Sequence, residues 1–326
     1  MQRRKKVVVM GGGTGTFVVL SGLKHYQVEL TAIVTMADTG GSARFEWDLF
    51  GLLPNSDVRK ALIGLAEVNG RSGGLLRELF SYRFDKGELA GMTFGNVFLV
   101  ALSQVLGSQE EAIERAGEIL RIKGKVLPVT MDRIDLVARY ESGSEVVGEH
   151  LIDEPEHDGK LKIVGLAARP KGRVFASARA AIETAEIIVF GPGDLYTSTL
   201  APVVVDDVGK LIAGSKAKLV YVVNLMTKYG QTYGFKASDH VREMEKYVGR
   251  KMDGVIINNA VLPAEALAKY EAEQAVQVED DLGADPRVAR ADVLQPAEVE
   301  PQNGDPLKRS LLRHDPEKLA KVVVNL

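Results

Sequence analysis

The sequence of 326 residues contains no cysteine, which excludes a disulfide framework, a thiolate zinc site and a cysteine nucleophile. It also contains no apolar run near the ~18 residues of a membrane span. The four apolar residues at 7–10, which follow a basic start, are too few for a signal peptide. A formal net charge of −3 gives no electrostatic argument for nucleic-acid binding. We therefore expect a cytoplasmic protein with no nucleic-acid partner and no membrane insertion.

Several common catalytic patterns are absent as well. The five histidines show no metal-ligand spacing, no Gly-x-Ser-x-Gly turn occurs, and no Gly-Lys-Ser/Thr follows the first glycines. The dinucleotide fingerprint Gly-x-Gly-x-x-Gly is missing, because the sixth position counted from Gly11 is Thr16. Glycine itself is abundant, at 33 of 326 residues, or about a tenth against a typical ~7%. The placement of these glycines is therefore the main clue to function.

Apolar residues alternate between strand-like and helix-like spacing along most of the chain. The spacing predicts strands at 5–10, 28–37, 186–190, 217–223 and 254–258, and helices at 16–26, 57–68, 74–82, 96–106, 110–122, 178–184, 203–214, 239–248, 264–273 and 315–324. Short strand-like runs at 125–130, 132–140, 145–150 and 161–167 predict a small inserted β meander.

Two stretches of the chain lack a clear periodic pattern. Residues 38–56 are predicted as a loop, and residues 285–306, which hold four of the twelve prolines, as an extended surface chain. Taken together, the alternation predicts one Rossmann-like α/β domain over residues 1–326. Its sheet is expected to be mainly parallel with helices on both faces, and the β-rich insertion is expected at about 125–168.

The first candidate binding segment is Gly11-Gly12-Gly13-Thr14-Gly15, between the first strand and the first helix. Glycine lets the backbone approach a ligand closely, and the N-terminus of the following helix offers free N–H groups to an anion. We interpret the segment as a phosphate or nucleotide contact. The alternative is a tight strand-to-helix turn.

The second candidate segment begins with Asp38 at the end of the second predicted strand and continues to Gly40, Gly41 and Ser42. An acid at that place can act in catalysis or bind a ribose hydroxyl. Through hard oxygen ligands it can also bind a divalent cation such as Mg²⁺. The alternative is a loop closed by an Asx turn.

Three polar residues near predicted helix starts are further candidates. Asp57 is most simply a helix N-cap, and it is also a candidate catalytic acid. Arg59 is either a phosphate-binding fork or a solvated charge. Asn96 either caps the next apolar helix or points into the cleft.

Two more polar segments follow later predicted strands. The first contains Gly191, Gly193, Tyr196, Thr197 and Ser198, and the second contains Asn224 and Thr227. Their alternatives are a hydroxyl-rich turn and an asparagine that pins a loop.

Four of the five candidate segments, the fifth being Thr93-Phe94-Gly95-Asn96, lie at carboxyl ends of predicted strands, where doubly wound sheets bind ligands. A helix dipole contributes at most about 2 kcal/mol, whereas micromolar binding requires about 8 kcal/mol. We therefore expect several of these loops to form one cleft.

These motifs, in this order, resemble the CofD/YvcK family, which includes 2-phospho-L-lactate transferase and the bacterial gluconeogenesis factor proteins. The resemblance covers nearly the whole chain, and GPGDLYTS with NLMT favours the bacterial branch. The segments that carry it are VVVMGGGTG at 7–15, VTMADTGGS at 34–42, SDVRKALIGLA at 56–66, YRFDKGELAGMTFGNVFLVAL at 82–102, KGKVLPVT at 123–130, GPGDLYTS at 191–198, NLMTKYGQT at 224–232, DHV at 239–241 and RHD at 313–315.

The resemblance implies a Rossmann-like fold that holds a nucleotide or nucleotide sugar, such as a UDP-sugar, and a link to carbon metabolism, cell shape and wall synthesis. A homodimer and regulatory protein partners remain open. By the same likeness, the nucleotide-side residues are Gly12, Gly13, Thr14, Asn224 and Lys228, and the contacts to base or diphosphate are Tyr270 and Arg313.

The chain departs from the family pattern at three places. Thr39 stands where a second acid is usual, Asn55-Ser56 replaces Pro-Gly, and Gln231 stands where Glu is common. We therefore predict a nucleotide-sugar-binding regulator. The alternative is a Mg²⁺-dependent phospholactyl transferase that acts on a deazaflavin alcohol. A nicotinamide dehydrogenase is disfavoured by the missing dinucleotide fingerprint.

Overall fold

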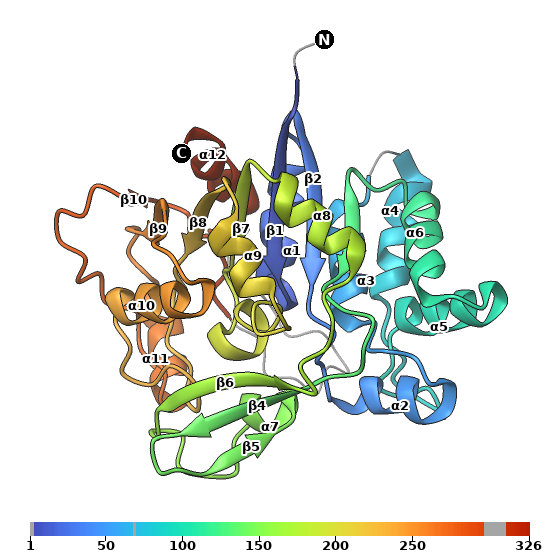
Figure 1. Cartoon of the computed structure of the whole chain (residues 1–326), viewed down its shortest axis with the longest axis horizontal. Coiled ribbons are helices and arrows are strands. Elements are labelled where there is room, and N and C mark those ends of the chain that lie inside the picture. The colour runs from blue at the N-terminus through green and yellow to red at the C-terminus, as the bar shows by residue number, and fades with distance from the viewer. Residues whose placement is uncertain (1–2, 68–69, 297–310) are drawn as a thin grey trace.

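The computed structural model describes residues 3–67, 70–296 and 311–326, with side chains described outside 41–45 and 70–72. Seven parallel strands form its central sheet (Figure 1). They are β1 (Lys5–Gly11), β2 (Val28–Val34), β3 (Lys125–Pro128), β7 (Ile187–Phe190), β8 (Lys218–Val222), β9 (Gly254–Asn258) and β10 (Val288–Ala291). The apolar, β-branched runs of β1, β2, β7, β8 and β9 are typical of parallel strands that are buried on both faces.

The strand order β10-β9-β8-β7-β1-β2-β3 has a point at which its direction reverses. From β1 the chain first builds outward to β2 and β3, and it then returns to place β7 on the other side of β1. This is the order of doubly wound sheets, in which ligands bind at the reversal, beyond the carboxyl ends of the strands. The predicted Rossmann-like fold with a parallel sheet is confirmed.

Helices cover both faces of the large sheet. On one face, Val7 and Val9 share an apolar core with α1 (Gly13–Leu23), α3 (Ser56–Leu65), α4 (Gly70–Ser81), α5 (Phe94–Leu106), α6 (Gln109–Ile119) and α12 (Pro316–Asn325). On the other face, Val8 and Met10 share a core with α8 (Ala176–Thr184), α9 (Val208–Gly214) and α10 (Ala237–Val248). This alternation follows from the two-residue period of a strand. In the described ranges, no helix is both long and apolar enough to cross a membrane.

Side-chain caps set the starts of three helices. The Thr93 hydroxyl accepts the Asn96 N–H at the start of α5, and the Ser108 hydroxyl accepts the Glu111 N–H at the start of α6. Asp315 accepts two backbone N–H groups at the start of α12, and a proline follows it in the first turn. The sequence predicts this last cap correctly.

The insertion is a three-stranded antiparallel sheet of β4 (Asp135–Tyr140), β5 (Glu145–Val147) and β6 (Ile163–Arg169). It carries the short helix α7 (Glu149–Asp153), where the prediction extended a strand to residue 150. Figure 1 shows it below the large sheet, at the end opposite the N-terminus. The predicted strand at 125–130 corresponds to β3, which pairs with β2, so it belongs to the large sheet and not to the meander.

The prediction of a loop over residues 38–56 is wrong, because this segment contains the helix α2 (Gly41–Phe50). The helix ends at Gly51, which has the left-handed conformation with φ 66°. Its buried Glu46 accepts hydrogen bonds from Asn55 and Asn96. These long-range bonds stabilise a helix that local spacing does not predict.

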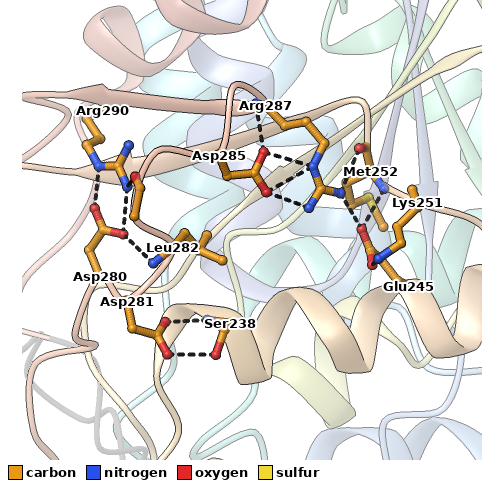
Figure 2. Close-up of polar contacts among 11 residues, drawn as sticks. Ser238, Glu245, Lys251, Met252, Asp280, Asp281, Leu282, Asp285, Arg287 and Arg290 are labelled. Atoms are coloured by element: carbon orange, nitrogen blue, oxygen red, sulfur yellow. Dashed lines mark hydrogen bonds and ion pairs between the residues drawn. The ribbon is translucent and has the colours of Figure 1, made fainter.

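The prediction of an extended surface chain over residues 285–306 misses one element of the described part, because β10 joins the sheet beside β9. Ion pairs connect this strand to α10 and to the segment that precedes it (Figure 2). Arg287 donates to Asp285 at 2.6 Å and to Glu245 of α10 at 2.7 Å, and Arg290 donates to Asp280 at 2.5 Å. We call Glu245, Asp280, Asp285, Arg287 and Arg290 the β10 edge network. The sequence of β10 lacks the apolar run that predicts a strand, because polar contacts and not apolar packing hold this strand in place.

The remaining described elements lie beyond the carboxyl ends of the strands. The five-residue helical turn η1 (Leu195–Thr199) follows β7, and α11 (Ala264–Ala272) packs in a small apolar cluster of its own with Leu225 and Leu312. These elements form the margins of the candidate site.

Candidate functional site

The turns that follow β1 and β7 touch each other at the reversal of strand order. A Cβ atom on Gly15 would lie 1.6 Å from the carbonyl oxygen of Pro192, so only glycine fits there. A Cβ atom on Gly13 would lie 3.3 Å from Ser198 Oγ. The structure therefore brings the first glycine segment together with the Gly191–Ser198 segment, as the sequence predicts.

The N-terminus of α1 opens toward these turns. The Gly13 N–H donates to Asp57 Oδ1 at 2.9 Å, and Gly12 leaves room for that carboxylate, because a Cβ atom there would lie 2.4 Å from Asp57 Oδ2. The N–H groups of Thr14 and Gly15 follow in the first turn, where a helix supplies no acceptor of its own. This end of α1 can therefore accept an anion.

Asp57 is not the N-cap that the sequence predicts. Asn55 occupies the cap position of α3, and Asp57 lies in the first turn. Besides accepting the Gly13 N–H, Asp57 Oδ1 accepts a hydrogen bond from Lys60 Nζ at 3.1 Å. Asp57 therefore places a negative charge at the positive end of α1.

The segment after β2 connects the large sheet to the insertion. Asp38 Oδ1 accepts the Gly40 N–H at 2.8 Å, which is the Asx turn left open by the sequence. The Thr39 hydroxyl accepts the His150 N–H of α7 at 3.0 Å. Gly41 begins α2, and Ser42 falls among the side chains outside the description. Thr39, which stands where the family usually has an acid, therefore holds α7.

A cavity of about 220 Å³ opens beside Asp38, between α2 and the insertion. Trp47 lines it, and the Arg133 guanidinium lies 4.2 Å from the centre of the Trp47 ring. This aromatic wall can accept a planar group. A second cavity, of about 690 Å³, lies along β3 between α6 and α8 and contains none of the predicted site residues.

Asn224 pins the β7 turn. Its Nδ2 donates to the Gly193 carbonyl at 2.8 Å, and its Oδ1 accepts the Gly193 N–H at 3.5 Å. Of the two interpretations that the sequence leaves open, the structure supports the asparagine that holds a loop backbone.

Five polar side chains, from α7 and from the loops after β7 and β8, meet around the ion pair of Lys228 and Asp153. Lys228 Nζ lies 2.8 Å from Asp194 Oδ2 and 2.5 Å from Asp153 Oδ1. Thr197 Oγ1 and Gln231 Nε2 donate to the same Asp153 oxygen at 3.1 and 2.9 Å. We call Asp153, Asp194, Thr197, Lys228 and Gln231 the Lys228 cluster. It joins α7 to the loops after β7 and β8.

Burial and charge act against each other in this cluster. Burial disfavours the Lys228 ammonium, but Asp194 and Asp153 outweigh it and raise the pKa of Lys228 above its ordinary value. Burial raises the pKa of Asp194, Lys228 opposes this rise, and Asp153 adds to it. Two carboxylates therefore share one cation.

Two further acids that the sequence analysis misses lie near the cleft. Burial raises the pKa of Glu149 well above its ordinary value, and the charges of Asp38, Asp153 and Asp57 raise it further. Burial also raises the pKa of Glu46 to about 8. Nothing in the local sequence marks either residue, because their burial depends on elements distant in the chain.

Two predicted contacts lie behind the cleft. Arg59 is buried and donates to Asn96 Oδ1 at 2.9 Å, so it is not the solvated charge of one interpretation. Asn96 does not cap α5, because Thr93 does, and its amide donates to Glu46 at 3.0 Å. Both side chains therefore support α2 and α3 from within.

Three other predicted residues serve packing or connection. The Tyr196 ring is fully buried and its hydroxyl donates to the Ile163 carbonyl at 3.3 Å, so it lies in the core and not in the cleft. The Thr227 hydroxyl accepts the Val276 N–H at 2.9 Å. The Tyr270 hydroxyl accepts the Leu312 N–H at 3.1 Å, which places this ring next to the chain that carries Arg313.

The magnesium contact at Asp38 stays a prediction. Within the described part of the chain, no group of three carboxylates or histidines could hold a metal ion. The Asp38 carboxylate closes its own turn, and Thr39 supplies no second acid.

The order of these loops around a parallel sheet is shared with known proteins. The family model described as 2-phospho-L-lactate transferase CofD matches residues 7–296. The chain belongs to this family.

Relatives within the family cover nearly the full length of the chain. The gluconeogenesis factor of Bacillus subtilis is 34% identical, covering 100% of this chain and 99% of its own. A relative from Thermotoga maritima, named for the same factor, is 40% identical over 98% of each chain. The crystal structure of a member of the UPF0052 family from Bacillus halodurans is 32% identical, with a TM-score of 0.87 over 99% of this chain and 100% of its own. The two relatives from Bacillus subtilis and Thermotoga maritima therefore carry the gluconeogenesis factor name.

Proposed function

We propose that this protein binds a nucleotide sugar of the UDP-sugar class in the cleft at the β1–β7 reversal, and that it acts in the cytoplasm as a gluconeogenesis factor. In that role it would regulate carbon metabolism and cell shape. The names of its relatives support the regulatory part of this proposal.

The observation that carries the proposal is the contact between the two glycine turns. Gly15 and Pro192 meet backbone to backbone; Gly15 lies in the first turn of α1, and Asp194, which pairs with Lys228 Nζ, follows Pro192 two residues later. A diphosphate has two anionic groups that suit a helix N-terminus and a lysine. The small cavity beside Asp38 gives room for a further group of the ligand.

Titration calorimetry with UDP-glucose, UDP and uridine tests the proposal. We expect UDP-glucose to bind and uridine to bind at least ~10-fold more weakly, because uridine lacks the charge that the helix and lysine attract. Failure of all nucleotides to bind at millimolar concentration would contradict the proposal.

A pair of glycine variants locates the site. Gly13→Val adds a side chain against Ser198 and is expected to abolish UDP-glucose binding. Gly143→Val is the matched control, because Gly143 also has a positive φ but lies in an exposed turn with open space around it. Equal loss of binding in both variants would assign the loss to backbone strain at a positive φ and not to a side chain that blocks the binding site.

The cavity beside Asp38 supports one other candidate function, a phospholactyl transferase acting on a deazaflavin alcohol, because its aromatic wall suits a planar acceptor. No step of this candidate runs through a metal ion, since no group of three carboxylates or histidines in the described part of the chain could hold one. Mass spectrometry of the wild type and Asp38→Asn, each given a nucleotide-activated phospholactate and the alcohol, tests this candidate. Product from the wild type with loss in the variant would favour the transferase.

A further inference from the structure

The insertion touches the cleft through α7, which is attached at both of its ends. At the first end, the Thr39 hydroxyl accepts the His150 N–H at 3.0 Å. At the other end, Asp153 enters the Lys228 cluster. The helix has only five residues and therefore gains little stability from its own hydrogen bonds. Ile152 anchors the helix in the apolar core, and these two polar attachments hold its ends.

The donors around Asp153 have a definite chemical character. An ammonium, an amide and a hydroxyl all donate to the same oxygen, Oδ1, at 2.5, 2.9 and 3.1 Å. These three donors belong to the loops after β7 and β8, which are built on the large sheet. A phosphate oxygen accepts this set of donors in the same way. Asp153 therefore occupies the place that an anionic oxygen of a ligand would take.

The charges nearby disfavour a second anion as long as Asp153 stays. Asp153 and Asp194 both lie within ion-pair distance of the single Lys228 ammonium, and the negative charges of Asp38, Asp153 and Asp57 all act on Glu149. A diphosphate added to this set would be repelled. If Asp153 leaves, Lys228 keeps Asp194 as a partner, so no buried charge is left unpaired.

We propose that Asp153 is an internal competitor of the ligand, which occupies Lys228, Gln231 and Thr197 until the ligand's phosphate displaces it. This inference rests on the proposed function, because it concerns the same cleft. It makes Asp153 a positioning residue that sets the affinity for phosphorylated ligands, and it makes the Asp153 end of α7 the part that moves on binding.

Calorimetry on Asp153→Asn tests the inference. The variant keeps the shape of the side chain but removes its charge, so the competitor is weakened. We expect UDP-glucose to bind ~10-fold more tightly than to the wild type, and uridine affinity to stay unchanged, because uridine has no phosphate to compete. A general loosening of the cleft would change both affinities.

Two further variants complete the design. Glu145→Gln removes the same charge from an exposed site of the insertion, where Glu145 pairs with Arg169, and is expected to leave UDP-glucose affinity within ~2-fold of the wild type. Thr39→Val removes the acceptor at the other end of α7 and is expected to tighten UDP-glucose binding in the same direction as Asp153→Asn. Thr39→Val gives an independent test if Asp153→Asn folds poorly.

The outcomes separate the two proposals. Wild-type binding of UDP-glucose with unchanged or weaker binding in Asp153→Asn and Thr39→Val would overturn the competitor role and leave the proposed function intact. Absence of binding in the wild type and in both variants would overturn both proposals. Tighter binding in Glu145→Gln, equal to that in Asp153→Asn, would assign the effect to overall charge and overturn the inference.

Discussion

The β10 edge network and the Lys228 cluster are both built from acids and bases, but their proportions differ. Lys251 also pairs with Glu245, so the edge has three cations for three acids, whereas the Lys228 cluster has one cation for two acids. At the edge, Arg287 and Arg290 face Asp285, Glu245 and Asp280 through forked hydrogen bonds (Figure 2). Hydrogen bonds from Arg287 lower the pKa of Asp285 to about 2. Near the cleft, burial raises the pKa of Glu149 and Asp194, and a single lysine serves two carboxylates.

The difference teaches how the same residue types serve two purposes. Forked guanidinium pairs are directional, so the edge network fixes β10 in one place. The Lys228 cluster has more negative charge than its cation can balance, so one of its carboxylates can be exchanged. The first arrangement suits stability, and the second suits binding.

The largest effect is expected from the buried acid behind the cleft. Folded Glu46 keeps its proton up to pH about 8, whereas the unfolded chain releases it near the ordinary value of 4.5. The folded state therefore binds more protons between these values, and the free energy of unfolding falls as pH rises through this window, by on the order of 4 kcal/mol. Glu46→Gln should remove this fall, as measured by urea unfolding at pH 5 and 8.

Glu145→Gln is the control for this prediction, because its carboxylate is exposed and paired on the surface. It should keep the wild-type dependence on pH. If the stability of Glu46→Gln fell with rising pH as steeply as that of the wild type, Glu46 would be ionised in the folded state.

The next effect concerns Lys228. Replacement by Met leaves Asp153 and Asp194 without their cation, so we expect a loss of about 2 kcal/mol of stability, because the site is only partly buried. UDP-glucose binding should also be lost. Lys236→Met, which breaks an exposed pair with Glu279, should cost much less stability, because solvent screens this pair. Equal costs measured by urea unfolding would erase the distinction between the cluster and a surface pair.

A smaller effect is expected at the sheet edge. Arg287→Met removes the bonds to Asp285 and Glu245 and should cost about 1 kcal/mol. Faster amide hydrogen exchange should be confined to β10 and its neighbours, because the strand lies at the edge. Exchange that accelerates in the cleft loops as well would show that the two regions are coupled.

The smallest expected effect is the pH dependence of the stability that Asp285 contributes, which has the opposite sign to that of Glu46. Because Asp285 has a folded pKa of about 2, below its ordinary 3.8, its contribution is present above pH 3.8 and is lost as pH falls through 2. The stability difference between wild type and Asp285→Asn should therefore shrink toward zero at pH 2. Acid titration followed by circular dichroism measures this, and a difference that persists at pH 2 would refute the assignment.

The sequence predicts the sheet because its strands are local, apolar and bounded by glycine, as in β1 and β7. It predicts the meeting of the glycine turns because the carboxyl ends of parallel strands share one edge. It misses α2 and β10, because Glu46 and Arg287 hold these elements through long-range polar contacts. It also misses Asp153, whose partners Thr197 and Lys228 are far away in the chain and meet it only after folding.

The insertion leaves the large sheet after β3 and returns at α8, and it carries both α7 and the exposed turn at 141–144. A fluorescent reporter spliced into that turn would share a small piece of chain with Asp153. Exchange of this carboxylate for a ligand would then be read as an optical signal. The chain thus offers an attachment point for a sensor of its own ligand, in a hairpin whose residues form no part of the cleft.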